Sequence, residues 1–272
     1  MNEALLPEPQ SAVLAGGEEG FLSLPVRTRK PRLSGITHVL DKGMPPTLLG
    51  AHLDLAGESI DFLKLGWGTG YLDPALAERV TLCREASVTL CTGGTFLEIA
   101  EAQGRRAEFA RWAAACGFGA VEVSNGLGLI EPTAKRELIS MLAADFVVLA
   151  ETGSKNPAAS ADPAAWVGEI GADLDAGATL AVAEGRESGT VGLYEPDGRV
   201  REEMVDRLTT QIPLERLVFE APRRAQQVWL IRHLGPAVNL GNVDPTEVLP
   251  LETLRLGLRA DTAELTTTRA LR

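Results

Sequence analysis

The sequence predicts an α/β protein, a single (β/α)8 TIM barrel, from two features of the chain. Apolar runs of strand length recur, separated by stretches whose apolar residues have helical spacing, which is typical of repeated β–α units and a parallel sheet. Eight such runs are present, and eight strands close a barrel. The expected strands are residues 36–40, 61–66, 87–91, 119–124, 146–151, 179–184, 216–220 and 237–241.

The ends of several of these runs carry a charged residue and then glycine, as in ITHVLDKG, FLKLGWGTG, FVVLAETGSK and TLAVAEGRESG. A strand that is apolar on both faces tolerates a charge only where it leaves the core, because burying an unpaired charge costs several kcal/mol. In a barrel the carboxyl ends of the strands meet at one face. We therefore expect the active site at that face.

The stretches between strands predict outer helices. In DPAAWVGEIGADLDAGA, Asp162 can accept hydrogen bonds from the first free amides, and Pro163 suits the first helical position. Trp166, Ile170 and Leu174 then share one face at four-residue spacing, and this face should pack on the barrel.

One domain accounts for most of the chain, since no repeat, linker or change in composition divides residues 30–262. We expect the barrel over that range. Residues 1–29 are expected to form a flexible N-terminal tail, and the polar residues 263–272 a C-terminal tail.

Composition excludes several classes of protein. A net charge of -11 argues against a nucleic-acid partner, because such surfaces need clustered Lys and Arg in excess. The three cysteines form no CxxC pair, which predicts buried thiols in a reducing compartment and no zinc site. The N-terminus lacks the basic leading region of a signal peptide, and no apolar run approaches the ~18 residues of a membrane span. We expect a cytoplasmic protein with no membrane partner, and a homo-oligomer, as is common for barrels.

The strand ends bring acids and bases to one rim. In chain order they include Asp41, Lys42, Lys64, Glu122, Glu151, Lys155, Glu184, Arg186, Glu220, Arg223, Asn239 and Asn242. Carboxylates in such a mixture can hold a hard cation, and Mg²⁺ prefers oxygen ligands. The basic groups can meet an anionic substrate. Any single Lys–Glu pair could equally be a structural cross-brace, but the whole set indicates a pocket for a small, multiply charged anion.

Several segments resemble the phosphosulfolactate synthase family, in unbroken order over about residues 30 to 262. They include KPRLSGITHVLDKGMPP, SIDFLKLGWGTG, LAETGSK, AEGRESG, VFEAPRRAQQ and VNLGNV. DKG, GWGT, EGRESG and EAP with a following QQ are together far more specific than one glycine motif. The resemblance implies a (β/α)8 barrel lyase, Mg²⁺-dependent, that adds sulfite to phosphoenolpyruvate to give (2R)-phospho-3-sulfolactate, a step toward coenzyme M or sulfolactate.

The resemblance also implies roles for the strand-end residues. Lys155 matches the lysine that the family is proposed to use as proton donor. The phosphate, carboxylate and sulfite would be bound by Lys42, Lys64, Arg186, Arg223 and Asn239. Mg²⁺ ligands or lysine partners would come from Asp41, Glu151, Glu184 and Glu220, with Glu151 or Glu184 first.

Two departures from the family pattern leave alternatives open. Ser154 stands where the family commonly has a lysine, and Cys91 and Thr92 stand where it often has an aromatic residue and proline. The same barrel could thus use another nucleophile or another enol phosphate. Plant heat-stress proteins also resemble this family, so a non-enzymatic role is a third hypothesis. The convergence of Lys155, Arg186 and several carboxylates favours catalysis.

Overall fold

The closed barrel expected from the sequence is confirmed. The structure is a computed structural model that describes residues 21–153 and 162–267. Its eight strands pair in sequence order, all in parallel, and the last pairs with the first. The strands are β1 (Thr37–Asp41), β2 (Phe62–Leu65), β3 (Thr89–Thr92), β4 (Ala120–Val123), β5 (Val147–Thr152), β6 (Leu180–Ala183), β7 (Leu217–Glu220) and β8 (Leu240–Val243). Each predicted strand is found, and β8 begins three residues later than expected.

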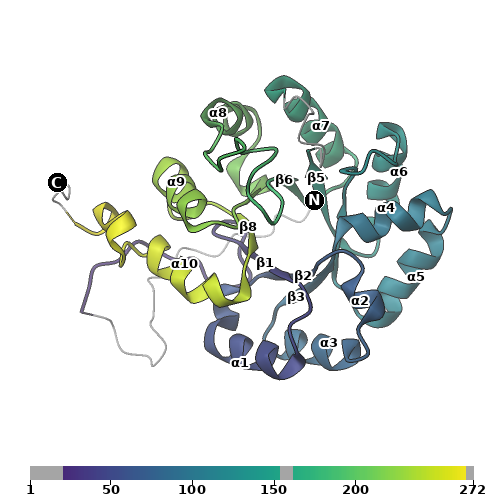
Figure 1. Cartoon of the computed structure of the whole chain (residues 1–272), viewed down its shortest axis with the longest axis horizontal. Helices are drawn as coiled ribbons and strands as arrows, with labels where there is room; N and C mark the ends of the chain where they lie inside the picture. Colours follow the sequence, from purple (N-terminus) through teal and green to yellow (C-terminus); the bar gives the residue numbers. More distant parts are fainter. Residues whose placement is uncertain (1–20, 154–161, 268–272) are drawn as a thin grey trace, which may run out of the picture.

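The helices form a ring around the strands (Figure 1). They are α1 (Pro46–Ala56), α2 (Thr69–Leu72), α3 (Leu76–Glu85), α4 (Gly94–Ala102), α5 (Arg106–Cys116), α6 (Pro132–Leu142), α7 (Pro163–Asp175), α8 (Glu202–Gln211), α9 (Arg224–Leu234) and α10 (Val248–Arg255). Short 3-10 turns are η1 (Gly57–Ser59), η2 (Leu214–Arg216), η3 (Pro245–Glu247) and η4 (Ala260–Leu265).

Helix α7 forms as its sequence predicts. The Asp162 side chain accepts a hydrogen bond from the Ala164 amide at 3.1 Å, and proline follows at the first helical position. Trp166 and Ile170 are buried against the barrel, and Leu174 packs partly buried beside them. The capping residue thus fixes where the helix starts, and the apolar face fixes how it docks.

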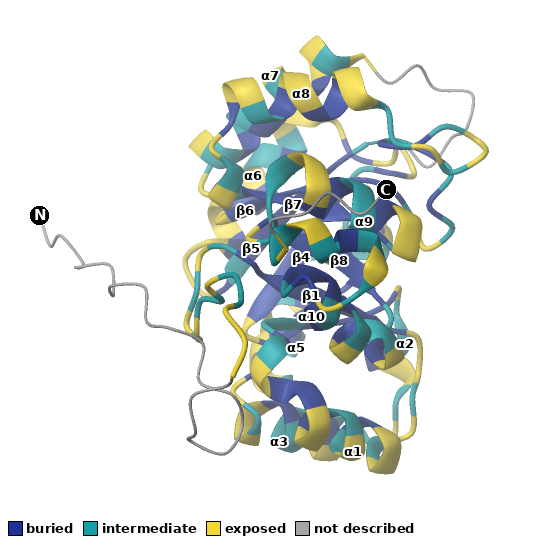
Figure 2. Cartoon of the chain, turned by 90° about the vertical axis from the view of Figure 1, so that its left-hand side faces the viewer, coloured by how far each residue is buried: buried dark blue, intermediate teal, exposed yellow. Residues whose placement is uncertain are grey.

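Two layers of apolar side chains build the core. One lies between the strands and the helices, and the other fills the barrel interior with residues that include Leu149, Val182 and Val218. Figure 2 shows the strands as mostly buried and the outer faces of the helices as exposed. The interior is a packed core up to the layer where charged residues begin.

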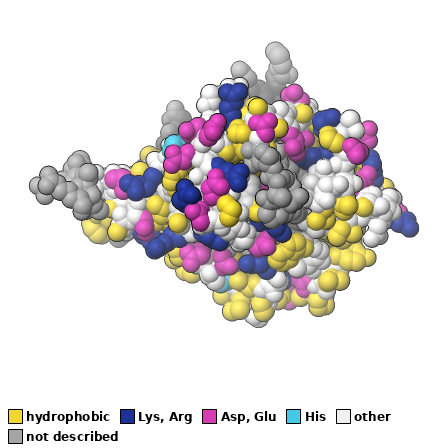
Figure 3. Space-filling view, turned by 45° about the horizontal axis from the view of Figure 1, so that its top comes forward, with side chains coloured by type: hydrophobic (Ala, Val, Ile, Leu, Met, Phe, Trp, Pro, Cys, Tyr) yellow, Lys and Arg dark blue, Asp and Glu magenta, His cyan; other side chains and the backbone are white. Residues whose placement is uncertain are grey.

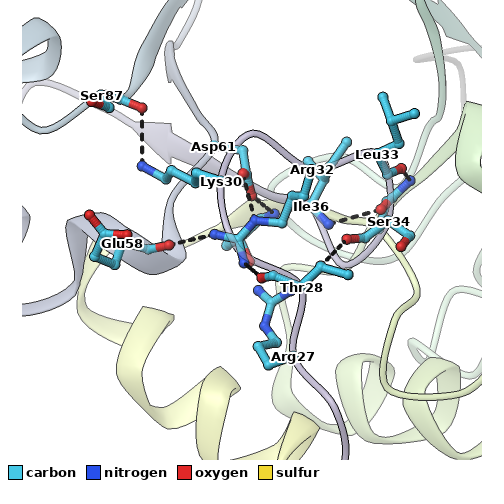
Figure 4. Close-up of polar contacts among 12 residues, drawn as sticks. Arg27, Thr28, Lys30, Arg32, Leu33, Ser34, Ile36, Glu58, Asp61 and Ser87 are labelled. Carbon is cyan, nitrogen blue, oxygen red and sulfur yellow. Dashed lines mark hydrogen bonds and ion pairs between the residues drawn. The ribbon is translucent and has the colours of Figure 1, made fainter. Parts of the chain in front are cut away.

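The amino end of the barrel is covered by the segment 27–36, which precedes β1 (Figure 4). Arg32 donates to Asp61 at 2.8 Å, and the other oxygen of this carboxylate accepts from the first amide of β1 at 2.9 Å. Arg27 binds both oxygens of Glu252 on α10 at 2.8 Å. The barrel therefore gains contacts from Arg27 onward, three residues before the predicted domain start, and residues 1–20 of the predicted tail lie outside the described residues.

The surface carries charges of both signs. Figure 3 shows Lys and Arg interspersed with Asp and Glu over one face, with hydrophobic side chains gathered toward its lower edge. Within residues 21–153 and 162–267, no helix has the length and apolar character needed to cross a membrane.

Candidate active site

A cavity of about 230 Å³ opens at the carboxyl ends of the strands. This is the face that the strand-end charges indicated. Its lining comes from most of the strands and the loops that follow them: Leu40, Lys64, Gly66, Trp67, Gly93, Gly94, Thr95, Glu122, Leu127, Glu151, Glu184, Arg186, Glu187, Glu220 and Asn242.

Lys64, on β2, lies at the centre of the charged layer. Its Nζ donates to Glu122 Oε2 at 2.7 Å and to Glu220 Oε1 at 3.3 Å, and all three side chains are almost fully buried. Burial alone would lower the pKa of Lys64, but Glu122, Glu220 and Glu151 raise it well above the usual lysine value. The side chain is therefore an ammonium group, and it holds two carboxylates from opposite sides of the barrel.

Backbone amides from two glycine motifs hold the remaining oxygens of those two carboxylates. Gly94 donates to Glu122 Oε1 at 2.9 Å, and the amides of Gly185 and Arg186 donate to Glu220 Oε2 at 2.9 and 2.8 Å. A Cβ at position 94 would lie 2.4 Å from the Ser124 hydroxyl, and one at position 185 would lie 2.8 Å from the Glu220 carbonyl. Only glycine allows this close approach. These amides of TGG and EGRESG thus bind carboxylates of the protein itself.

Four glutamates surround the cavity floor. Glu122, Glu151 and Glu220 each offer an oxygen within 4.8 Å of the others, and Glu184 lines the same cavity. Burial, with Glu184 and Glu122 adding to it, raises the pKa of Glu151 well above its usual value. Burial also raises the pKa of Glu220, to about 7, although Lys64 opposes it. For Glu122, Lys64 outweighs burial and lowers the pKa.

Two of these oxygens fit a bound cation. Glu151 Oε1 and Glu184 Oε2 are buried and have no hydrogen-bond partner among the described residues. A buried carboxylate oxygen without a partner is costly, and a divalent cation would satisfy it. Because the donor set is all oxygen, Mg²⁺ fits it better than a soft metal. Glu151 and Glu184, with Glu220 beside them, are the residues that would hold it.

The end of β5 is fixed by a buried lysine that the sequence did not single out. Lys135, on α6, donates to the backbone carbonyl of Glu151 at 2.7 Å. It also pairs with Glu169 at 2.6 Å and with Asp173 at 2.7 Å, both on α7. This cross-brace positions the backbone that carries the Glu151 carboxylate.

Five of the predicted site residues come together around the cavity: Lys64, Glu151, Glu184, Arg186 and Glu220. Lys42 is exposed at the rim, in a shallow pocket that shares Glu187 and Asn242 with the cavity. Lys155 lies outside the described residues, which stop at Gly153 and resume at Asp162.

Asp41 and Arg223 do not line this cavity. Asp41 Oδ1 accepts from the amides of Gly43 and Met44 at 2.8 and 2.7 Å, and its other oxygen pairs with Arg79. Its carboxylate is thus occupied in closing the turn after β1. Arg223 is exposed and lines a separate surface groove beside α9.

The expected position of Asn239 is wrong. Because β8 begins at Leu240, Asn239 precedes the strand and lies at the amino end of the barrel. Its Oδ1 accepts from the Ile36 amide at 2.8 Å, and its Nδ2 donates to the Leu217 carbonyl at 3.0 Å. Asn242 is the asparagine of β8 that lines the cavity.

Sequence reasoning missed two more features of the site. Glu122 belongs to the strand-end set, but the family resemblance gave it no role, although GAVEV shows the same pattern of a charge ending an apolar run. Asn242 also belongs to the strand-end set, but the binding role was assigned to Asn239. Trp67 lies within a glycine motif, and no charge pattern marks it.

Comparisons with known proteins find relatives over most of the chain. Residues 25–261 match the family model described as (2R)-phospho-3-sulfolactate synthase. A phosphosulfolactate synthase of Methanothermobacter thermautotrophicus is 41% identical, over 88% of this chain and 95% of its own length. One from Bacillus subtilis is 38% identical, over 89% and 97%. Among solved structures, a deoxyribose phosphate aldolase from Aeropyrum pernix has a TM-score of 0.54 at 16% identity, covering 81% of this chain and 90% of its own, which shows the fold alone.

Proposed function

Because the chain belongs to the (2R)-phospho-3-sulfolactate synthase family, we propose that it is an enzyme that adds sulfite to phosphoenolpyruvate with Mg²⁺ bound in the central cavity. The product would be (2R)-phospho-3-sulfolactate. The observation that carries this proposal is the buried layer of four glutamates around Lys64, two of which have an oxygen with no partner in residues 21–153 and 162–267.

The reaction requires that two anions meet. The sulfur lone pair of sulfite forms a bond to the methylene carbon of phosphoenolpyruvate, and the electrons of the double bond move toward the substrate carboxylate. The neighbouring carbon then takes a proton, which completes the addition without loss of the phosphate. A bound Mg²⁺ would supply positive charge that offsets both the repulsion between the reactants and the charge that develops on the carboxylate.

The chain's own residues would organise the rest. Arg186 lines the cavity mouth and would face the anionic substrate. The Lys64 ammonium lowers the pKa of Glu122 and holds the side chains of Glu122 and Glu220 in place before substrate enters. Glu151 and Glu184 would hold the cation. For Lys155, outside the described residues, the role of proton donor is proposed on the family resemblance.

The direct test is product formation by the purified protein. With Mg²⁺, phosphoenolpyruvate should be consumed only when sulfite is present, and mass spectrometry should find phosphosulfolactate. Lys155→Ala should remove most turnover while the protein stays folded. Retained turnover in that variant would contradict the role of Lys155.

The alternatives predict different outcomes of the same assay. A different product with another nucleophile or enol phosphate would support the specialised enzyme that Ser154 suggests. A non-enzymatic stress protein would show neither turnover nor thermal stabilisation by phosphoenolpyruvate with Mg²⁺. Such a protein would gain nothing from buried carboxylate oxygens without partners, which only destabilise it.

A further inference from the structure

Several non-glycine residues with left-handed backbone conformations line the central cavity. Four described non-glycine residues have positive φ: Trp67 at 54°, Ser87 at 53°, Arg186 at 57° and Asn242 at 52°. All but Ser87 line the cavity. Left-handed backbone is disfavoured in such residues because Cβ approaches the following carbonyl oxygen. Conformations of this kind persist where the surrounding structure enforces them, and they cluster at functional sites.

At Asn242 the cause is a β-bulge. Thr37 of β1 pairs with Leu240 of β8, and Val39 pairs with Val243, so β8 carries one extra residue between the two pairings. A bulge re-aims side chains, because consecutive residues of a regular strand point to opposite faces.

Position 241 shows the effect of the bulge. A Cβ on Gly241 would lie 3.1 Å from Val218 Cγ1 and 3.2 Å from His38 Nδ1, so this residue faces the barrel interior. Asn242, the next residue, nevertheless lines the cavity. The bulge therefore lets two successive residues face inward. Because residue 241 is glycine, the space beside it is not filled by a side chain.

The amide of Asn242 differs from those of the other described asparagines. Asn125 accepts from the Ile130 amide and donates to its carbonyl, which closes a loop. Asn239 bonds the backbone with both ends of its amide. Asn242 is 6% exposed, and its Oδ1 is buried with no hydrogen-bond partner among the described residues. Its Nδ2 is not one of the buried unpartnered atoms and forms no hydrogen bond with a described residue, so this donor remains available to the cavity. A buried amide oxygen without a partner lowers stability. Structure alone gives no reason for an asparagine here.

We propose that Asn242 is a substrate-binding residue whose side-chain amide donates a hydrogen bond to an anionic oxygen of the bound enol phosphate. This inference rests on the proposed function and deepens it. A neutral donor is suitable at this position because a glutamate lies close by: Glu220 of the neighbouring strand β7 is in register with Gly241 of β8. The amide can orient an anion there without forming a new ion pair with the glutamates.

The test compares glycine substitutions at two left-handed positions. Asn242→Gly removes the amide and relieves the backbone, and Ser87→Gly relieves the backbone away from the cavity. Calorimetry with phosphoenolpyruvate and Mg²⁺ should show affinity for phosphoenolpyruvate reduced roughly 10- to 100-fold in Asn242→Gly, the usual effect of losing a hydrogen bond to a charged group. Its Tm should equal or exceed that of the wild type. Ser87→Gly should bind phosphoenolpyruvate within twofold of the wild type.

A second variant distinguishes loss of the amide from misfolding. Asn242→Asp keeps the size and the tolerance for left-handed backbone, and it should weaken binding at least as much, because it places a negative charge beside the anion. Inorganic phosphate and pyruvate, titrated separately, identify which group of the substrate the amide contacts. If it contacts the phosphate, the variants at position 242 should bind inorganic phosphate more weakly than the wild type. If it contacts the carboxylate, they should bind pyruvate more weakly.

Three results would overturn the proposal. The first is affinity for phosphoenolpyruvate within twofold of the wild type in both variants at position 242. The second is a tenfold loss of Mg²⁺ affinity in Asn242→Gly, measured without substrate, which would make Asn242 a cation ligand instead. The third is a wild type that does not bind phosphoenolpyruvate, which would overturn the proposed function as well. A wild type that binds it but shows no sulfite-dependent turnover would reject the proposed reaction alone.

Discussion

The two ends of the barrel bury charged side chains in different proportions. At the amino end, Arg27 pairs with Glu252 and Arg32 with Asp61, and a third arginine, the buried Arg255, contacts Glu252 and donates to backbone carbonyls. At the carboxyl end, four glutamates surround Lys64, and two of their oxygens have no partner among the described residues. Arginines that bind acids and backbone carbonyls hold a structure together, whereas an excess of buried acid indicates a site for a positively charged ligand. We therefore propose that the amino end is the structural end and the carboxyl end the functional one.

The largest expected effect comes from removing the lysine of the functional end. Lys64→Met leaves Glu122 and Glu220 buried without their cation, which should cost about 3–5 kcal/mol of unfolding free energy near neutral pH. Urea unfolding with and without the substitution measures this. The matched control is Lys42→Met at the exposed rim, expected within about 0.5 kcal/mol of the wild type. Equal effects of the two substitutions would contradict the central place of Lys64.

An amino-end substitution should separate stability from activity. Arg32→Ala removes hydrogen bonds to Asp61 and to the backbone of the covering segment, and should cost about 1–3 kcal/mol. Because Arg32 lies away from the cavity, kcat/KM per folded molecule should stay within twofold of the wild type. A tenfold loss of kcat/KM at a temperature where the variant is fully folded would break the division between the two ends.

Neutralising one carboxylate should weaken cation binding. Glu151→Gln is expected to reduce Mg²⁺ affinity at least tenfold by calorimetry. The same variant without metal should be at least as stable as the wild type at pH 7, because burial and the neighbouring acids disfavour the Glu151 carboxylate. Asp41→Asn is the control: its Mg²⁺ affinity should be unchanged while its Tm falls, since Arg79 loses a charged partner. Weakened Mg²⁺ binding in Asp41→Asn would contradict this account, because it would show that Asp41 contributes to the cation site.

Mg²⁺ binding should also depend on pH. Glu220 has a pKa of about 7, and that of Glu151 is also raised. Cation binding requires both as carboxylates, so affinity should rise by up to about tenfold per pH unit and per proton released as pH passes upward through 7. Calorimetry in buffers of different ionisation enthalpy counts the protons. Binding without proton release at pH 6.5 would contradict these pKa values.

Without metal, stability should change with pH in the opposite sense. The native Glu220 binds its proton more tightly than the unfolded chain does, so the stability that the protonated group contributes is complete at low pH. It is lost as pH rises from the usual glutamate pKa toward 7. Saturating Mg²⁺ should reduce this loss.

The barrel and most of the charged layer could be predicted from the sequence because both depend on local residue patterns. Apolar runs reveal strands, and a charge at the end of such a run reveals which residues share the carboxyl face. Lys64, Glu151, Glu184 and Glu220 were found in this way, and the cavity confirms that they lie together.

The remaining site residues depend on contacts that no local pattern carries. Asp41 ends an apolar run like the others, but its partner Arg79 lies 38 residues away on α3, and only the fold brings them together. Asn239 and Asn242 were indistinguishable because a three-residue shift in the start of β8 decides which end of the barrel each occupies. Asn242 faces the cavity through a bulge in its pairing with β1, which the sequence does not show.

A crystal grown with Mn²⁺ and phosphoenolpyruvate tests the functional end most directly. Anomalous scattering should place the cation among oxygens of Glu151, Glu184 and Glu220, with the enol phosphate beside it in the cavity. A fully occupied cation elsewhere, or a cavity without cation or substrate at saturating concentrations of both, would contradict the account.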